Sequence, residues 1–269
     1  MQSDRLDAIR HHLYANGASS IQALAEAIGA SLATVRRDLL VLEQQGVISR
    51  THGGASIAHA ADAEVGFEIR EKQNLAAKRA IAQAAYDLLE PHSSVFLDAG
   101  TTVLQLVRRL RISPIPLTIF TNGLLVAQEL MRVPKLKVTM IGGQLRVENA
   151  SLVGPAAEAA LGGLWFDHLF LGASAIGEDD CIYSIDPAEA SLNALMQKRS
   201  ARTVVLADAS KFGRRATYLV SSLVSPVHLL TDTRVSPECC QRLRSAGVTL
   251  STVEPFDQLG PRLATGGGL

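Results

Sequence analysis

The feature that most constrains the fold is a repeating pattern in residues 79–255, where short apolar runs alternate with segments of helical periodicity. The apolar runs are rich in β-branched residues and end in small or polar ones. Strands that alternate with helices in this way predict an α/β domain with a largely parallel sheet. The predicted strands are residues 94–97, 117–120, 137–141, 169–171 and 203–206.

The polar residues that follow these strands indicate a ligand site, because ligands of parallel α/β sheets bind at the carboxyl ends of the strands. The first turn, residues 98–102, places hydroxyl groups and backbone N–H groups at a predicted helix N-terminus, where anions are favoured. That turn alone is equally an ordinary βα turn with a capping threonine. Five such strand ends together favour a site for a polar ligand, with candidates Asp98, Gly100, Thr101, Thr102, Asn122, Arg146, Ser174 and Lys211.

The N-terminal segment has a different pattern, centred on a helix predicted from Ser31 to Leu42. Leu32, Val35, Leu39 and Leu42 recur at helical spacing, so we expect them to form one buried stripe. Ser31 precedes the stripe and can cap the first free N–H groups of the helix. A short amphipathic helix of this kind packs one face and presents the other to solvent.

The exposed face of this predicted helix carries Thr34 and Arg37, with Arg36 on its flank. Arginine suits contacts with phosphates and bidentate contacts with guanine in the major groove of DNA, although an isolated Arg-Arg pair is more often a solvated surface. A second amphipathic helix, residues 21–28, precedes it across a turn at residues 29–30. Helix, short glycine-containing turn and helix together predict a helix-turn-helix unit that binds DNA.

Residues 47–57 contain two short β-prone runs joined by Gly-Gly, which predicts a hairpin. A hairpin directly behind a recognition helix forms a wing. Arg50 and His52 would then lie at its tip, where they can reach a phosphate or the minor groove. Taken alone, both are ordinary surface residues.

The order and spacing of residues 34–39, Gly46 and residues 50–55 resemble the DNA-binding domain of the DeoR family of bacterial transcription regulators. The resemblance implies a winged helix that binds operator DNA, usually as a repressor. The implied DNA contacts are Ser31, Thr34, Arg36, Arg37, Arg50, His52 and Gly53.

The resemblance extends over nearly the whole chain. Residues 98–102, 121–122, 142–146, 154, 172–174 and 210–213 look like the effector domain of that family. This domain is similar in fold to ribose-5-phosphate isomerase and commonly senses phosphorylated sugars. By position, the resemblance implies that Gly100, Thr101 and Thr102 hold the phosphate. It also places Asn122, Ser174 and Lys211 at the sugar or its phosphate, with Arg146 as a neighbour.

An active isomerase is the main alternative, because isomerisation of a sugar needs a carboxylate base beside the reacting carbons. The isomerases supply aspartates from an Asp-Gly-Ala-Asp loop, whereas residues 171–174 here are Leu-Gly-Ala-Ser. We therefore expect no catalysis, no metal and no cofactor. A pure interaction module is a further alternative, and it predicts no effect of substitutions at Thr101 or Lys211. Asp186, Glu189 and Asn193 either line the pocket or form a solvated face.

Composition sets the remaining expectations. Lys+Arg and Asp+Glu are both 26, so any surface that binds nucleic acid must be local. The three cysteines lack metal-binding spacing, and the chain has no long apolar run, so we expect a cytoplasmic protein without membrane contact. Symmetric DNA-binding proteins read paired half-sites, which predicts a homo-oligomer, a dimer or tetramer. The expected domains are residues 1–57 (DNA-binding), 58–78 (linker), 79–255 (effector-sensing) and 256–269 (tail).

Overall fold

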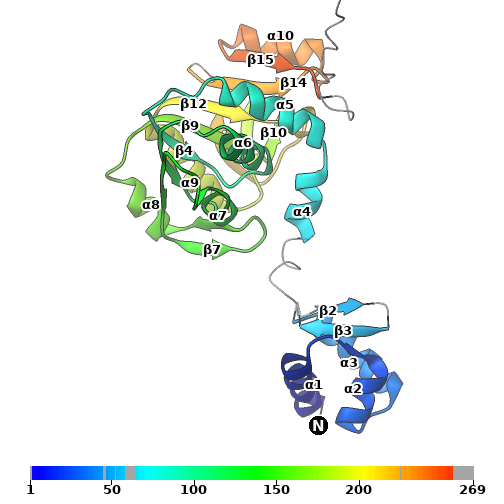
Figure 1. Cartoon of the computed structure of the whole chain (residues 1–269). Coiled ribbons are helices and arrows are strands. Elements are labelled where there is room, and N and C mark those ends of the chain that lie inside the picture. Colours follow the sequence, from blue (N-terminus) through cyan, green and yellow to red (C-terminus); the bar gives the residue numbers. More distant parts are fainter. Residues whose placement is uncertain (1, 45–46, 52, 58–64, 225, 257–269) are drawn as a thin grey trace, which may run out of the picture. The chain divides into compact units, whose positions relative to one another are not determined.

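The computed structural model describes residues 2–44, 47–51, 53–57, 65–224 and 226–256 (Figure 1). The chain divides into two compact units, Met1–Gly66 and Phe67–Leu269. Each unit has its own hydrophobic core, and the core of the second unit lies on both faces of a sheet.

The first unit combines helices with a small antiparallel sheet, in which the strand order is β1-β3-β2. The hairpin of β2 and β3 directly follows the second helix of the helix-turn-helix, as the sequence predicted. The elements are α1 (Gln2–Asn16), β1 (Ser19–Ser20), α2 (Ile21–Ile28), α3 (Leu32–Gln44), β2 (Ile48–Thr51) and β3 (Gly54–Ile57).

The core of this unit lies between the three helices and the hairpin. Val35, Leu39 and Leu42 of α3 are fully buried in it, as expected. Leu32 is not part of the stripe, because 45% of its surface is exposed. A helical side chain leans over the turn that precedes it, and α3 begins at Leu32, so no helical turn lies beneath this residue.

The second unit is built on a seven-stranded sheet with strand order β15-β14-β12-β9-β4-β5-β6. Every pair of neighbours in this sheet is parallel. The five predicted strands are present, and two strands beyond them extend the sheet at its β12 side. The strands are β4 (Ser94–Leu97), β5 (Leu117–Thr121), β6 (Leu136–Met140), β9 (Phe166–Gly172), β12 (Ser200–Leu206), β14 (His228–Asp232) and β15 (Thr249–Val253).

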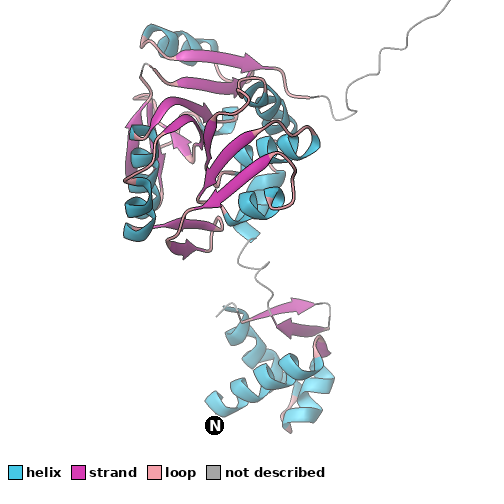
Figure 2. Ribbon diagram, turned by 60° about the vertical axis from the view of Figure 1, so that its left-hand side comes forward, coloured by secondary structure: helices cyan, strands magenta, loops and turns pink. Residues whose placement is uncertain are grey.

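Helices cover both faces of this sheet (Figure 2). Alternate residues of the central strand β4 show the two faces: Val95 and Leu97 pack with one core cluster, and Phe96 packs with the other. One face carries α5 (Leu75–Tyr86), α6 (Thr101–Ile112) and α7 (Leu124–Leu130), and the other carries α8 (Pro155–Leu161), α9 (Pro187–Lys198) and α10 (Pro237–Ser245). This is the α/β class that the strand pattern predicted.

Smaller elements complete the second unit. Two antiparallel sheets flank the main one, the first of β7 (Gln144–Arg146) and β8 (Ser151–Val153), the second of β10 (Ala175–Ile176), β11 (Cys181–Ser184) and β13 (Tyr218–Ser222). A single 3-10 turn, Ala209–Lys211, follows β12. No helix in the described part of the chain is long and apolar enough to cross a membrane.

The helix α4 (Val65–Lys72) lies within the stretch that was expected to be a linker. Phe67 on this helix is 2% exposed and belongs to the core cluster formed with α5, α6 and α7. The second unit therefore begins at Phe67, because this aromatic side chain needs the sheet domain to bury it.

Candidate functional site

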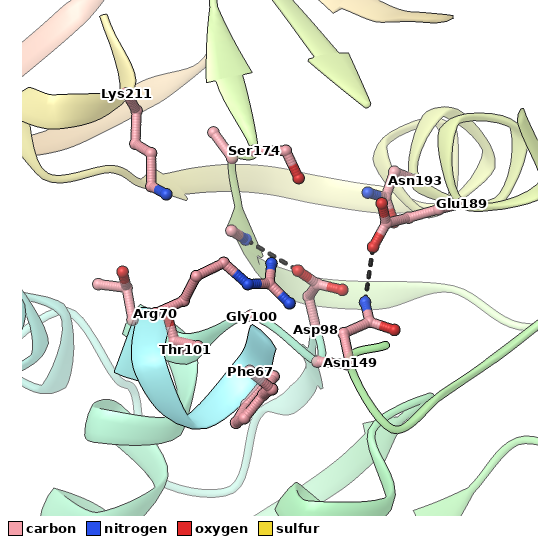
Figure 3. Close-up of a pocket in the computed structure, with 14 residues that line it drawn as sticks. Phe67, Arg70, Asp98, Gly100, Thr101, Asn149, Ser174, Glu189, Asn193 and Lys211 are labelled. Carbon is pink, nitrogen blue, oxygen red and sulfur yellow. Dashed lines mark hydrogen bonds between the residues drawn. The ribbon is translucent and has the colours of Figure 1, made fainter. Parts of the chain in front are cut away.

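A pocket opens at the carboxyl ends of β4, β9 and β12, which are neighbours in the sheet (Figure 3). Six of the eight predicted effector residues line it: Asp98, Gly100, Thr101, Thr102, Ser174 and Lys211. The other lining residues are Phe67, Arg70, Ala99, Asn149, Gly172, Ala173, Glu189 and Asn193. The convergence follows from the parallel arrangement, which brings equivalent strand ends to one edge.

Asn122 and Arg146, the other two predicted residues, do not line this pocket. Asn122 follows β5, one strand farther out, and its backbone oxygen accepts a hydrogen bond of 2.8 Å from the N–H of Leu152. Arg146 ends β7, and its Nε lies 3.4 Å from a carboxylate oxygen of Asp186. The Asn122 backbone thus meets the β7–β8 hairpin, and the Arg146 side chain lies against the start of α9.

The floor of the pocket is bare backbone. Gly100 and Gly172 approach each other there, and a Cβ added to Gly172 would lie 3.2 Å from a carboxylate oxygen of Asp98. Any larger residue at Gly172 would push against the Asp98 side chain. Glycine at these two positions thus lets a ligand come within contact distance of the main chain.

One end of the pocket is cationic. Thr101 and Thr102 begin α6, where backbone N–H groups lack partners within the helix and favour an anion. Lys211 points into the same space, and the guanidinium of Arg70 from α4 extends from this side toward Asp98 (Figure 3). Burial lowers the pKa of Arg70, while the charge of Glu189 raises it. Burial lowers the pKa of the Lys211 ammonium; the nearby Asp208 carboxylate raises it, and the positive charge of Arg70 lowers it further.

The opposite end presents carboxylate and amide groups. Asn149 donates a hydrogen bond of 2.7 Å from Nδ2 to Glu189, whose second oxygen accepts a hydrogen bond from Ser184 (Figure 3). Asn193, one helical turn after Glu189 on α9, is 6% exposed. Its Oδ1 is buried and has no hydrogen-bond partner among the described residues. This end is suited to receive a ligand that donates hydrogen bonds, such as one with hydroxyl groups.

Asp98 lies between the two ends and is 6% exposed. Its Oδ2 accepts a hydrogen bond of 3.0 Å from the N–H of Gly172. Burial, and secondarily the charge of Glu189, raise the pKa of Asp98 to about 7, against an ordinary value of 3.8. The carboxyl group therefore gives up its proton less readily than an ordinary aspartic acid.

Sequence reasoning missed three lining residues: Phe67, Arg70 and Asn149. The first two lie on α4, in the stretch assigned to the linker, and Asn149 lies in the turn between β7 and β8. The available signal was Phe67 with Ile69 in an otherwise polar stretch, which indicates a segment that docks on a domain. Glu189 and Asn193 were left open between a pocket and a solvated face, and the structure places both in the pocket.

In the first unit, α3 holds the predicted recognition residues. Ser31 accepts a hydrogen bond of 3.2 Å from the N–H of Thr34, which confirms it as the cap of this helix. The Thr34 hydroxyl lies 2.9 Å from the Ser31 hydroxyl. Arg36 and Arg37 are exposed on the same helix. Behind them, Asp38 is fully buried and forms an ion pair with Arg5 of α1.

The wing places Arg50 on β2, where its guanidinium lies 3.8 Å from a carboxylate oxygen of Glu43. Gly53 lies in the turn just before β3 with a φ of 93°, and its carbonyl accepts a hydrogen bond from the N–H of Ile21. His52, which was also predicted to contact DNA, lies outside the described residues. Arg36, Arg37 and Arg50 are thus exposed cations on a helix-turn-helix with a hairpin.

The two units define a class of protein: a DNA-binding helix-turn-helix joined to an α/β domain with a polar pocket. A family model for the DeoR-like helix-turn-helix domain matches residues 5–61, and one for the DeoR C-terminal sensor domain matches residues 73–233. The chain belongs to the DeoR family and is a DNA-binding transcription regulator with a sensor domain.

Curated relatives agree with this assignment. The HTH-type transcriptional regulator GlpR of Haloferax volcanii is 37% identical over 231 residues, 86% of this chain and 90% of the relative. The HTH-type transcriptional repressor CsqR of Escherichia coli is 33% identical over 80% of this chain and 82% of the relative. The L-fucose operon activator of Escherichia coli is 30% identical over 87% and 96%.

Solved structures include ribose 5-phosphate isomerase A of Methanocaldococcus jannaschii, with a TM-score of 0.37 and 16% identity over 50% of this chain and 53% of that one. The α/β assignment of the sensor domain rests on its own strand order. Within the described part of the chain, no group of three or more His, Cys, Asp or Glu residues is placed to hold a metal ion.

Proposed function

We propose that this regulator represses an operon for carbohydrate use, and that a phosphorylated sugar bound in the pocket relieves the repression. The observation that carries the proposal is the division of one pocket into a cationic end and a hydroxyl-binding end. A sugar phosphate has the same two parts, a dianion and a set of hydroxyl groups. Two relatives support separate parts of this proposal: CsqR is a transcriptional repressor, and the L-fucose operon activator acts on an operon for a sugar.

At the cationic end, Gly100, Thr101 and Thr102 offer backbone N–H groups and hydroxyls to the phosphate oxygens, and Lys211 neutralises charge. At the other end, Asn193 Oδ1 accepts from a sugar hydroxyl and thereby gains the partner that it lacks. Asp98 and Ser174 lie between these groups and contact the sugar. A buried acceptor without a partner costs about 1–3 kcal/mol, so such a site discriminates against ligands without a hydroxyl there.

We further propose that the pocket binds its ligand without converting it. Glu189 is already engaged through both oxygens by Asn149 and Ser184, which suits an acceptor better than a mobile proton carrier. Asp98 is held by the N–H of Gly172 at the pocket floor. The loop at residues 171–174 supplies no acid.

For the DNA half, we propose that Thr34, Arg36 and Arg37 contact bases and phosphates in the major groove, with support from Ser31, Gly53, Arg50 and His52. Exposure of both arginines on α3 supports this assignment. A homo-oligomer would present two such helices to paired half-sites, and effector binding would then change operator affinity by favouring one arrangement.

A thermal-shift screen of the full chain tests the ligand class. We expect phosphorylated sugars to raise the melting temperature while the same sugars without phosphate leave it unchanged, because a ligand of the folded state stabilises it by mass action. If no phosphorylated sugar in the panel raises the melting temperature, the proposal is contradicted.

A second experiment uses operator sites selected from random DNA. Fluorescence anisotropy then measures whether the ligand weakens or strengthens binding of the protein to these sites. Weaker DNA binding with the ligand is expected, and stronger binding would contradict relief of repression. Product analysis after incubation with the ligand tests for catalysis, and detection of a converted ligand would contradict the proposal that the pocket only binds it.

A further inference from the structure

The helix α4 brings a cation into the effector pocket from a part of the chain that adjoins the DNA-binding unit in sequence. Arg70 on this helix lines the pocket together with Phe67, one turn earlier (Figure 3). One guanidinium nitrogen of Arg70 donates a hydrogen bond of 3.0 Å to the backbone oxygen of Glu148. The guanidinium carbon lies 5.8 Å from the centre of the Phe67 ring. In Figure 3 the guanidinium points between Thr101 and Asp98, into the pocket.

Arg70, Lys211 and Lys78 lie near one another, and the positive charge of Arg70 lowers the pKa of both lysines. Arg70 and Lys211 each lower the pKa of Lys78, which burial, as the largest cause, brings to about 8. Lys78 is 1% exposed and donates a hydrogen bond from Nζ to the backbone oxygen of Arg70. Asp208 is the carboxylate that offsets the charge of both lysines. Burying like charges together is unfavourable, and a dianion among them would relieve the repulsion.

The attachment of α4 to the second unit is small. Among its described side chains, Phe67 is the only apolar one that is buried, while Ile69 is 52% exposed. Besides Phe67, the interactions that hold the helix include the Arg70 hydrogen bond to Glu148, the Lys78 hydrogen bond to Arg70, and an ion pair between Glu71 and Arg108. A helix of eight residues held in this way is expected to exchange between docked and undocked states.

We propose that the Arg70 guanidinium binds the anionic group of the effector together with Lys211, so that a bound ligand fastens α4 to the sensor domain. This inference rests on the proposed function, and it adds both a ligand contact and a route of regulation. A guanidinium presents five N–H donors in a planar fork that matches the oxygens of a phosphate, whereas Lys211 supplies a point charge.

The regulatory consequence follows from the position of α4 in the chain. Seven residues, 58–64, separate the last strand of the wing from the start of α4. The ligand contacts Arg70 only when α4 is docked, so it binds the docked state more tightly and shifts the population toward it. Docking fixes the point from which the DNA-binding unit is tethered, and it thereby limits the arrangements of that unit that can reach an operator.

The first test measures affinity. Isothermal titration of the full chain with inorganic phosphate, and with a phosphorylated sugar found by the screen, is carried out in sodium chloride of matched ionic strength. Arg70→Gln removes the charge but keeps a donor for the Glu148 carbonyl, and we expect at least a tenfold loss of affinity. Arg70→Lys keeps the charge without the fork and should lose less. Arg79→Gln, an exposed arginine on α5, is the matched control and should stay within about twofold.

The second test follows α4 itself by amide hydrogen exchange of residues 65–72. Saturating ligand should slow this exchange in the wild type and in Arg79→Gln, and it should do so much less in Arg70→Gln. Unchanged affinity in Arg70→Gln, or ligand without effect on exchange in α4 of the wild type, would overturn the assignment while leaving the proposed function intact. If the wild type binds no phosphorylated compound at all, both fail. If Arg70→Gln does not fold, Arg70→Lys and the wild-type exchange decide the question.

Discussion

Gly100 and Gly172 face each other across the floor of the effector pocket, so closely that a Cβ on Gly100 would lie 3.2 Å from the Cα of Gly172. A Cβ on Gly172 would lie 3.2 Å from the Cα of Gly100 and also 3.2 Å from Asp98 Oδ2. We expect Gly172→Ala to displace Asp98, to lower the free energy of unfolding by about 1–3 kcal/mol and to weaken effector binding at least tenfold.

Urea denaturation and isothermal titration measure the two effects of Gly172→Ala. Gly163→Ala is the matched control, because a Cβ there would meet no atom within 4 Å. Wild-type affinity in Gly172→Ala would show that the ligand does not approach this part of the floor.

The raised pKa of Asp98 predicts a pH dependence of stability. Its value is about 7 in the folded chain and 3.8 ordinarily, so the folded state holds this proton more tightly than the unfolded state does. The stabilisation is complete below about pH 4 and is lost as pH rises through 7. The change is on the order of 4 kcal/mol, at about 1.4 kcal/mol per unit. Asp98→Asn cannot titrate, and its unfolding free energy should fall less than that of the wild type between pH 5 and 8. Urea denaturation measures both proteins at each pH. If the unfolding free energies of the wild type and Asp98→Asn change with pH in parallel, the raised pKa is contradicted.

Arg37 is exposed on α3, and we expect Arg37→Ala to weaken binding to a selected operator by at least tenfold, since a bidentate base contact contributes about 1–3 kcal/mol. Fluorescence anisotropy with the operator and with unrelated DNA measures the loss of specificity. Arg79→Ala removes the same charge from the second unit and should retain operator affinity. Equal effects of the two substitutions would mean that only net charge matters.

The buried carboxylate of Asp38 holds α1 against the recognition helix through Arg5. This ion pair raises the pKa of Arg5 above its ordinary value. Asp38→Asn should lower the melting temperature of the first unit by about 5–10 °C, because removal of a buried, paired charge disrupts a small core. Differential scanning calorimetry of the full chain measures it.

The control for Asp38→Asn is Asp7→Asn. Asp7 also forms an ion pair, at 2.8 Å with Arg10, but 53% of its side chain is exposed. Exposed pairs contribute little, so this variant should melt within about 2 °C of the wild type. If both variants lose a similar amount of melting temperature, the burial of Asp38 does not determine how much its ion pair contributes to stability.

The sequence predicted those features that depend on local periodicity and on turn chemistry. Val35, Leu39 and Leu42 lie in the core because a helix repeats its faces, and the strand ends at Asp98, Ser174 and Lys211 converge because parallel strands share an edge. Leu32 has the spacing of the buried stripe but is exposed. The spacing does not show which elements pack against the first turn of a helix.

Strand order explains why two of the predicted residues do not line the pocket. Asn122 and Arg146 follow the strand pattern as well as Ser174 does, but β5 and β6 lie on the outer side of β4, away from β9 and β12. Order within a sheet is a tertiary property that single-strand patterns do not contain. Phe67 and Arg70 were not predicted to line the pocket for a related reason: α4 is short, and it is positioned by the domain that it packs against.

The single aromatic anchor of α4 also bears on how such a regulator evolves. Burial of one phenylalanine contributes about 1.5–3 kcal/mol, and the coupling free energy between two sites in an allosteric protein is typically about 1–3 kcal/mol. If the effector fastens α4 as proposed above, substitution of Phe67 alone would cover the range of free energy over which the ligand controls this helix. Selection could then set the threshold of the response, from inducible to constitutive, at one position that lies outside the recognition helix.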